Sequence, residues 1–296
     1  MSQSAGQSAY FVVYHGSRDP RPAALAEQLA SQMATCLQQR SPNALSSELA
    51  SSGEDAPLLA IAPLECCETP LQSRLAQFAH EARQQGYSQV QIIPLFLMAG
   101  VHVREDIPAE VEAAQEIVGD RQQLSLCPYL GSHPRLADYL RSLFSAAPSS
   151  SLNVDQTVHR VLISHGSRRS GGNRAIEAIA QEIQAQPAYW SVEPKIETCL
   201  MPILQDKTSS DSQPSRVMEI LPYFLFAGGI TDAIGQAIAE FQRRFPSVQF
   251  RLAKPLGANR AIAQMAVDLT ASPAVQAPFS PYPQSSDSSS FMTAVG

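Results

Sequence analysis

The chain of 296 residues has no apolar run that approaches the roughly 18 residues needed to cross a bilayer. Its first residues, MSQSAGQSAYFVVYHG, lack the basic region, apolar stretch and small-residue cleavage site of a secretory signal. The net charge is −6 and no run of lysines or arginines is present, so the basic stripe of a nucleic-acid-binding protein is missing. These absences predict a cytoplasmic protein that partners neither a membrane nor a nucleic acid.

Cysteine is scarce and irregularly spaced. The five cysteines (Cys36, Cys66, Cys67, Cys127 and Cys199) form no C-x-x-C pair. Their number and spacing predict neither a disulfide framework nor a zinc ribbon. We expect buried, reduced thiols, the usual state of free cysteine in a folded domain.

The motifs of several large enzyme classes are also absent. The chain contains no G-x-S-x-G, G-x-x-x-x-G-K-[ST], G-x-G-x-x-G or H-E-x-x-H sequence. Ser17 lies close to His15 in the sequence HGS, but neighbouring residues of one turn make a poor nucleophile and base. The sequence therefore argues against these chemistries, hydrolysis by a serine nucleophile included.

The chain does contain an internal repeat. Three motifs of the first half recur in the same order in the second half. The pairs are FVVYHGSRDP and VLISHGSRRS, IIPLFLMAG and EILPYFLFAG, and LGSHPRLADYL and LGANRAIAQMA. Self-similarity of this kind predicts two homologous domains in tandem.

Composition sets the expected domain boundaries. We expect an N-terminal domain over residues 1–147, a linker containing serine and proline over 148–157, and a C-terminal domain over 158–270. Residues 271–296 are rich in serine and proline, a composition that cannot build a packed core. We predict that this last segment is a disordered tail.

The halves differ in length between their first and second shared motifs. Residues 40–57 are polar and predict a surface insertion in the first half. Residues 204–216, LQDKTSSDSQPSR, stand where the first half has the helical pattern of residues 71–86. A helix of the second half is therefore expected to be shortened or lost.

Short apolar runs alternate with helical patterns along each half. In the first half the apolar runs cover residues 10–14, 58–62, 90–97 and 124–129. Such alternation is typical of parallel strands whose two faces are covered by helices. We predict an α/β fold with two tandem doubly wound domains, each with a four-stranded, mainly parallel sheet.

Three potential metal ligands follow three of these strands. His15 immediately follows the first strand, Glu65 follows the second and His102 follows the third. Ligands of such sheets bind outside the carboxyl ends of the strands, so we expect the three side chains to converge. Glu68 is a close competitor for the role of Glu65.

Two imidazoles and one carboxylate suit a borderline divalent ion such as Co²⁺, Fe²⁺, Ni²⁺ or Zn²⁺. Three protein ligands or fewer leave a coordination position open, as metal transfer or catalysis requires. Neutral imidazole also accepts protons near pH 7. The set predicts a metal site with an open coordination position, whose histidines can also accept protons.

The sequences YHGSRDPR, APLECCETPL and IIPLFLMAGVHVREDIPAEV resemble motifs of the class II chelatases, most closely the long, two-domain sirohydrochlorin chelatases of the CbiX and SirB kind. The resemblance implies two similar α/β domains facing across a cleft. It implies that His15 and His102 bind the incoming metal and that Glu65 faces the same cleft. It further implies insertion of Co²⁺ or Fe²⁺, with Ni²⁺ as a further candidate, into a sirohydrochlorin-type tetrapyrrole in cobalamin or siroheme synthesis, with no permanently bound cofactor.

The substrate that the resemblance implies carries a ring of carboxylates. Arg18, Arg21 and Arg104 lie near the motifs and are candidates to bind these groups through charge-assisted hydrogen bonds. Ser17 lies beside them and is a further candidate for substrate binding. Solvated positions for the arginines, and a helix-capping role for Ser17, are the alternatives.

The second half departs from the pattern. His165 repeats the first histidine of the site, but Ile230 stands in the place of His102. The sequence MPILQ likewise offers no glutamate in the place of Glu65. We therefore expect one active site per chain, in the N-terminal half. We also expect a monomer, because the internal repeat supplies a pseudo-symmetric pair of domains within one chain. A tetrapyrrole or metal carrier without turnover is the alternative function, and a two-lobed solute-binding protein is disfavoured by the lack of a signal peptide.

Overall fold

A computed structural model describes residues 7–40, 56–145, 157–205 and 216–272 of the chain. Within these ranges no helix is both long and apolar enough to span a membrane. The predicted linker, surface insertion and tail fall almost entirely outside the described residues and stay predictions.

The N-terminal half is built around one parallel sheet. Its main elements are β1 (Ser8–Tyr14), α1 (Arg21–Arg40), β2 (Leu59–Pro63), α2 (Leu71–Gln84), β3 (Gln89–Pro94), the π-helical turn η3 (His102–Asp106), α3 (Ile107–Val118), β4 (Gln123–Leu126) and α4 (Leu136–Ser145). The strand order is β2-β1-β3-β4, and every neighbouring pair is parallel.

The C-terminal half repeats this arrangement. Its main elements are β5 (Thr157–Ser164), α5 (Arg174–Glu182), β6 (Gln186–Tyr189), α6 (Ile196–Gln205), β7 (Arg216–Pro222), α7 (Gly229–Arg244), β8 (Gln249–Leu252) and α8 (Arg260–Asp268). The order β6-β5-β7-β8 is again parallel throughout. The predicted pair of doubly wound, four-stranded domains is confirmed. The helix of the second half that was expected to be shortened or lost is present as α6, whose described residues number 10, against 14 in α2. Residues 206–215 lie outside the described ranges, so its shortening stays a prediction.

Strand β1 is apolar over most of its length because both faces of its sheet are covered. In β1, Phe11 and Val13 pack with α2 and α3, whereas Val12 and Tyr14 pack on the opposite face with α1. None of these four residues is more than 9% exposed. Successive side chains of a strand alternate between faces, so a strand buried on both sides needs a continuous apolar run.

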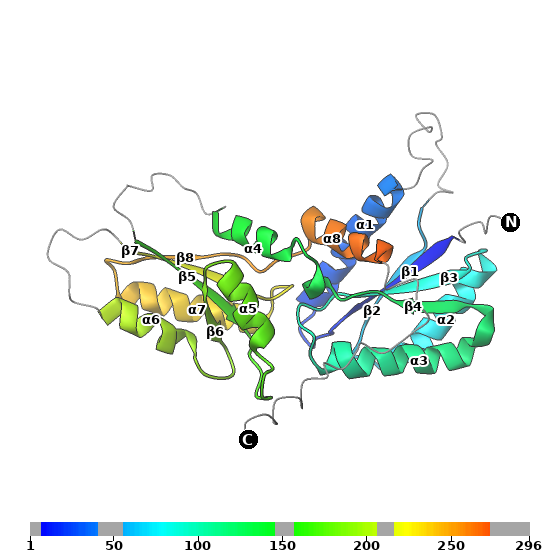
Figure 1. Cartoon of the computed structure of the whole chain (residues 1–296), viewed down its shortest axis with the longest axis horizontal. Helices are drawn as coiled ribbons and strands as arrows, with labels where there is room; N and C mark the ends of the chain where they lie inside the picture. The colour runs from blue at the N-terminus through cyan, green and yellow to red at the C-terminus, as the bar shows by residue number, and fades with distance from the viewer. Residues whose placement is uncertain (1–6, 41–55, 146–156, 206–215, 273–296) are drawn as a thin grey trace, which may run out of the picture.

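The last helix of each half packs on the other half. In Figure 1, α4 lies with the β5–β8 sheet although it ends the first half, and α8 lies against α1. The Arg160 guanidinium of β5 lies 5.5 Å from the centre of the Phe144 ring in α4. Arg40 of α1 donates a 2.7 Å hydrogen bond to the Val267 carbonyl in α8. The two terminal helices are therefore exchanged between the halves.

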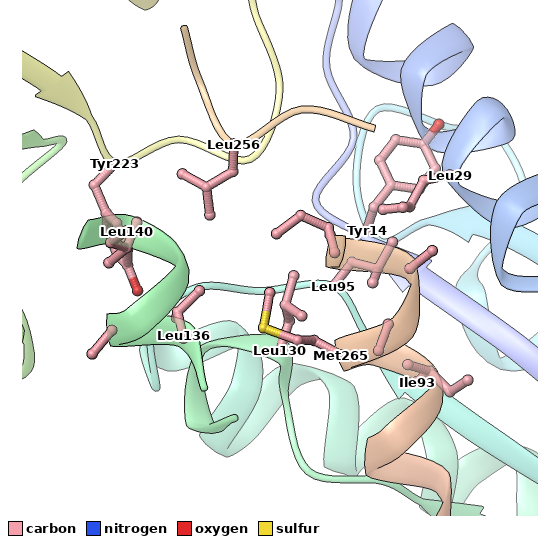
Figure 2. Close-up of a cluster of buried hydrophobic side chains, with 14 of the residues drawn as sticks. Tyr14, Leu29, Ile93, Leu95, Leu130, Leu136, Leu140, Tyr223, Leu256 and Met265 are labelled. Atoms are coloured by element: carbon pink, nitrogen blue, oxygen red, sulfur yellow. The ribbon is translucent and has the colours of Figure 1, made fainter. Parts of the chain in front are cut away.

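This exchange creates a hydrophobic core that both halves share. Figure 2 shows Leu136 and Leu140 of α4, Leu256 and Met265 of the second half, and Tyr14 of β1 in one cluster. The two leucines of α4 are at most 1% exposed. Burial of a large apolar side chain contributes roughly 1.5–3 kcal/mol, so the cluster stabilises the halves as one unit.

The expectation of buried, reduced cysteines holds for only part of the set. All five are free, and Cys36, Cys127 and Cys199 are buried. Cys66 and Cys67 are exposed, so the prediction of burial is wrong for this pair. The reason is their place in the loop after β2, where residues 65–70 are all exposed at the carboxyl edge of the sheet.

Candidate metal centre

His15, Glu65 and His102 meet at the carboxyl edge of the N-terminal sheet. His15 directly follows β1, Glu65 lies in the loop after β2, and His102 opens the turn η3 after β3. The three strands are neighbours in the sheet and run parallel, which brings their carboxyl ends together. One ligand atom from each side chain lies within 4.8 Å of the others, and the described residues hold no other such group of three.

The carboxylate of Glu65 lies between the two imidazoles. Its Oε2 is 4.0 Å from His15 Nε2, and its Oε1 is 3.9 Å from His102 Nε2. The two rings stand edge to face, with their centres 4.9 Å apart. Glu68 does not belong to this group, so the geometry favours Glu65 over its competitor as the third ligand.

The His15 ring is oriented by its own turn. Its Nδ1 lies 2.9 Å from the Gly16 carbonyl oxygen. A carbonyl oxygen only accepts hydrogen bonds, so Nδ1 carries the proton and donates. The lone pair of the neutral ring is then on Nε2, which faces Glu65.

The His102 ring is held by a carboxylate that the sequence analysis missed. His102 Nδ1 lies 2.6 Å from Asp106 Oδ2, four residues later in the π-helical turn. Metal-binding histidines usually donate their second ring N–H to such a partner, which fixes the tautomer and raises the basicity of the ligand nitrogen. The H-x-x-x-D spacing in HVRED was the available signal, because residues four apart in a helix are neighbours.

Position 16 of the HGS turn requires glycine for two structural reasons. Gly16 has a φ of +91°, a left-handed conformation that favours glycine. A Cβ atom at this position would lie 2.2 Å from the Glu65 carbonyl oxygen. The Glu65 N–H in turn donates a 3.0 Å hydrogen bond to the His15 carbonyl. The loops that carry the two ligands are therefore locked together through their backbones.

The site is walled on one side and open on the other. The ring of Phe96, which is 9% exposed, lies 6.3 Å from the His15 ring and 6.0 Å from the His102 ring, measured between centres. The side chains of His15 and Glu65 are 56% and 50% exposed. A metal ion and a large planar ligand can therefore reach the ligand atoms from solvent.

The arginines that were predicted to bind the substrate differ in whether their guanidinium groups are free to do so. Arg18 and Arg104 are exposed. Arg21 is already bound by two carboxylates, since its Nη2 lies 2.6 Å from Asp19 Oδ2 and 2.7 Å from Asp232 Oδ2. The Arg21 guanidinium lowers the pKa of Asp19 through these hydrogen bonds. Arg21 therefore ties the two halves together and offers few free donors to a substrate.

Ser17 makes a local contact rather than capping α1. Its Oγ accepts a 3.0 Å hydrogen bond from the Asp19 N–H. The Asp19 carboxylate in turn accepts one from the N–H of Arg21, the first residue of α1. Asp19 therefore supplies the acceptor at the start of the helix, as the short polar residues before helices commonly do.

The second half holds a different set of residues at the matching edge. The Ser191 N–H donates a 2.9 Å hydrogen bond to the His165 carbonyl, as Glu65 does to the equivalent carbonyl of the first half. Ser191 therefore occupies the place of the glutamate. The alignment of MPILQ with that place is wrong, because these residues lie inside α6 and resemble APLEC only in composition. Ile230 lies in the first turn of α7.

Comparisons with known proteins agree with the repeat. The model of the CbiX family matches residues 9–147 and 159–272. The sirohydrochlorin ferrochelatase of Priestia megaterium is 26% identical over 205 residues, which cover 68% of this chain and 74% of that protein.

Solved structures share the fold. SirB from Bacillus subtilis, determined with Fe³⁺, matches with a TM-score of 0.67 and 18% identity over 89% of this chain and 94% of that chain. The sirohydrochlorin chelatase SirB from Bacillus subtilis subspecies spizizenii, in complex with cobalt, matches with a TM-score of 0.61 and 18% identity over 89% and 93% of the two chains. Because the family match spans both halves of the repeat, the chain belongs to the CbiX family.

Proposed function

We propose that this protein is a sirohydrochlorin chelatase that inserts a divalent metal ion into the tetrapyrrole and releases two protons. The observation that carries the proposal is the group formed by His15, Glu65 and His102. The Priestia megaterium relative is a sirohydrochlorin ferrochelatase, which supports the same class of reaction.

The three side chains suit a metal ion that is held loosely. Ligands of a tetrahedral site with bonds of about 2.1 Å lie about 3.4 Å apart. The Glu65 oxygens are 4.0 and 3.9 Å from the nearest nitrogens of His15 and His102. Movements of under about 1 Å close the set on an ion. With three protein ligands, a coordination position stays open for the nitrogens of the tetrapyrrole.

The histidines also suit the proton balance of the reaction. Two pyrrole N–H bonds break as the nitrogens bind the 2+ ion, and the bonds from the ion to the protein break. Each released imidazole then has a free Nε2 lone pair that accepts a proton. The Gly16 carbonyl and the Asp106 carboxylate stabilise this form, because both already bind the Nδ1–H of a ring.

The metal substrate that we propose is Co²⁺ or Fe²⁺, with Ni²⁺ as a further candidate. Two imidazoles and a carboxylate bind several first-row divalent ions, so the ligand types alone do not rank them. The two SirB structures hold Fe³⁺ and cobalt. Cobalt insertion would place the protein in cobalamin synthesis, and iron insertion in siroheme synthesis.

We assign the chemistry to the N-terminal domain, residues 1–147, and the opposite side of the substrate site to residues 158–270. The ligand set lies in the first half only, so each chain carries one metal centre among its described residues. Arg18, Arg21 and Arg104 are all exposed, but Arg21 is already bound by Asp19 and Asp232, so Arg18 and Arg104 are the better candidates to bind the substrate. A monomer suffices in this proposal, because one chain supplies both α/β units.

Anaerobic metal insertion into sirohydrochlorin, followed by absorbance with Co²⁺, Fe²⁺ and Ni²⁺, tests the proposal. Wild type should turn over many times, and the His15→Ala/His102→Ala variant should show only the spontaneous rate. His165→Ala is the matched control, since it alters the same turn in the half without the ligand set, and it should stay active. Pigment binding by wild type without any gain over the spontaneous rate would contradict the proposal and indicate a carrier.

A further inference from the structure

Two ion pairs connect the carboxyl-end loops of one half to those of the other. Arg21 contacts Asp232 through two nitrogen–oxygen pairs, at 2.7 and 3.2 Å. Arg169 Nη1 lies 3.7 Å from Glu105 Oε1. In each pair the arginine follows the HGS turn of one half, and the carboxylate lies in the helical turns after the third strand of the other half. The two contacts therefore join equivalent elements of the repeat, although the residues that make them do not stand at equivalent positions.

The two contacts differ in strength. Arg21 makes a bidentate contact with Asp232 of the other half and also donates hydrogen bonds to Asp19. The contact of Arg169 with Glu105 is single and long, and the two side chains are 69% and 66% exposed. An exposed pair of this kind contributes about 0–1 kcal/mol. Arg169 therefore exchanges its carboxylate partner at little cost, whereas Arg21 does not.

Arg169 lies beside the turn that carries His102. Glu105 belongs to the five-residue turn that begins with His102 and ends with Asp106. The guanidinium of Arg169 thus comes from the second half and lies against the turn that holds a metal ligand of the first half. The position equivalent to Arg169 in the first half is Asp19, so the repeat has opposite charges at this point of its two loops.

We propose that Arg169 binds a carboxylate of the tetrapyrrole, and that Glu105 takes the place of this carboxylate in the substrate-free protein. This inference rests on the proposed function. A guanidinium binds a carboxylate through two parallel hydrogen bonds, a geometry that its present contact with Glu105 lacks. Exchange of one carboxylate for another leaves the charge at Arg169 balanced while the ring reaches the ligand set.

Binding of metal-free sirohydrochlorin, measured by fluorescence titration of the full chain, tests this role. Arg169→Ala should raise the dissociation constant about tenfold, the loss expected for a charge-assisted hydrogen bond. Glu105→Gln should leave it unchanged or lower it by up to about threefold, because a competing carboxylate is removed. Arg243→Ala is the control, since Arg243 is an exposed arginine paired with Glu240 at the far end of α7 and should have no effect.

The different responses expected of the two variants, weaker binding in Arg169→Ala and unchanged or tighter binding in Glu105→Gln, separate this role from a purely structural one. If the pair only ties the halves together, Arg169→Ala and Glu105→Gln should weaken binding alike, and that result would overturn the inference. Unchanged binding in Arg169→Ala would overturn it as well. Co²⁺ binding without pigment should be the same in Arg169→Ala and wild type, which shows that the metal centre is intact. Failure of wild type to bind the pigment would overturn the proposed function and this inference together.

Discussion

The two halves of the chain share a fold and a histidine turn, but they do not share a ligand set. The histidine of each HGS turn donates from Nδ1 to the next carbonyl, at 2.9 Å in the first half and 3.0 Å in the second. Ser191 stands where the first half has Glu65. Ile230 stands where it has His102. The HGS turn therefore belongs to the architecture, and the chemical difference lies in side chains after the second and third strands.

The helix after the third strand also begins differently in the two halves. In the first half, a π-helical turn runs from His102 to Asp106 before α3 continues. In the second half α7 starts directly at Gly229, and the Thr231 hydroxyl accepts a hydrogen bond from the Gly228 N–H. Wide π-helical turns are frequent at functional sites. The irregular turn thus occurs in the half with the ligand set, and the regular, capped helix in the half without it.

The largest difference between the halves should appear in the insertion rates of two single variants, each of which lacks one histidine. His102→Ala removes a proposed metal ligand and proton acceptor, and we expect the insertion rate to fall at least about 100-fold. His165→Ala removes only the ring of the equivalent turn in the second half, and we expect less than about threefold. Steady-state insertion assays on both variants, with folding checked by circular dichroism, provide the measurement. Equal loss in two folded variants would show that both halves carry the chemistry.

The carboxylate behind His102 should have the next largest effect. Asp106→Asn keeps the size of the side chain but removes the charge that supports the Nδ1–H of the imidazole. Loss of such a partner typically lowers metal affinity or activity 10- to 100-fold. Metal affinity is measured by titration with Co²⁺ in the absence of pigment. Wild-type affinity in this variant would mean that the hydrogen bond does not support the ligand.

The convergence of the ligand set could be predicted because it needs only the order of elements. A β-α-β connection between neighbouring parallel strands places successive carboxyl ends at one edge of the sheet. His15, Glu65 and His102 each follow an apolar run, so their meeting did not depend on side-chain detail. The parallel sheets followed from the same alternation of runs and helices.

The exchanged helices, the place of Ser191 and the Arg21–Asp232 contact could not be predicted from the sequence pattern. An amphipathic helix such as α4 fits an apolar sheet face of either half, so the pattern of residues 136–145 does not reveal the exchange with α8. Ser191 was missed because β6 (Gln186–Tyr189) is short and carries a proline. The engagement of Arg21 by Asp232 requires two segments far apart in the chain to meet.

The glycines of the two HGS turns should respond differently to alanine. Gly16→Ala places a Cβ against the Glu65 carbonyl, which is fixed backbone, whereas Gly166→Ala meets side-chain atoms of Val192 and Tyr189. Both positions have a positive φ, so both variants should lose about 1–3 kcal/mol of stability. Only Gly16→Ala displaces the loop of Glu65, and it should also lose about tenfold in insertion rate. Urea unfolding and insertion assays distinguish the outcomes, and equal activity in the two variants would contradict the locking of the two loops.

The smallest effect concerns the residues at the start of the exchanged helices. The Nδ1 of His133 accepts a 3.1 Å hydrogen bond from the Arg135 N–H, and the side chain of Asn259 accepts the corresponding 3.0 Å bond in the second half. His133 is 7% exposed. Its burial, and then the charge of Arg135, lower its pKa. The neutral ring is therefore the form that the folded protein stabilises.

A histidine with a lowered pKa makes the folded state less stable in acid. As the pH decreases through the unfolded-state pKa of about 6.5, the unfolded chain takes up a proton that the folded chain does not bind. The free energy of unfolding therefore decreases as the pH decreases. One such group contributes a slope of at most about 1.4 kcal/mol per pH unit. His133→Asn gives the first half the residue of the second and should reduce the slope below about pH 6.5 in urea unfolding experiments. Part of the slope should remain, because burial also lowers the pKa of His159. A slope that does not change in His133→Asn would mean that the ring is not the neutral acceptor that its contact with Arg135 requires.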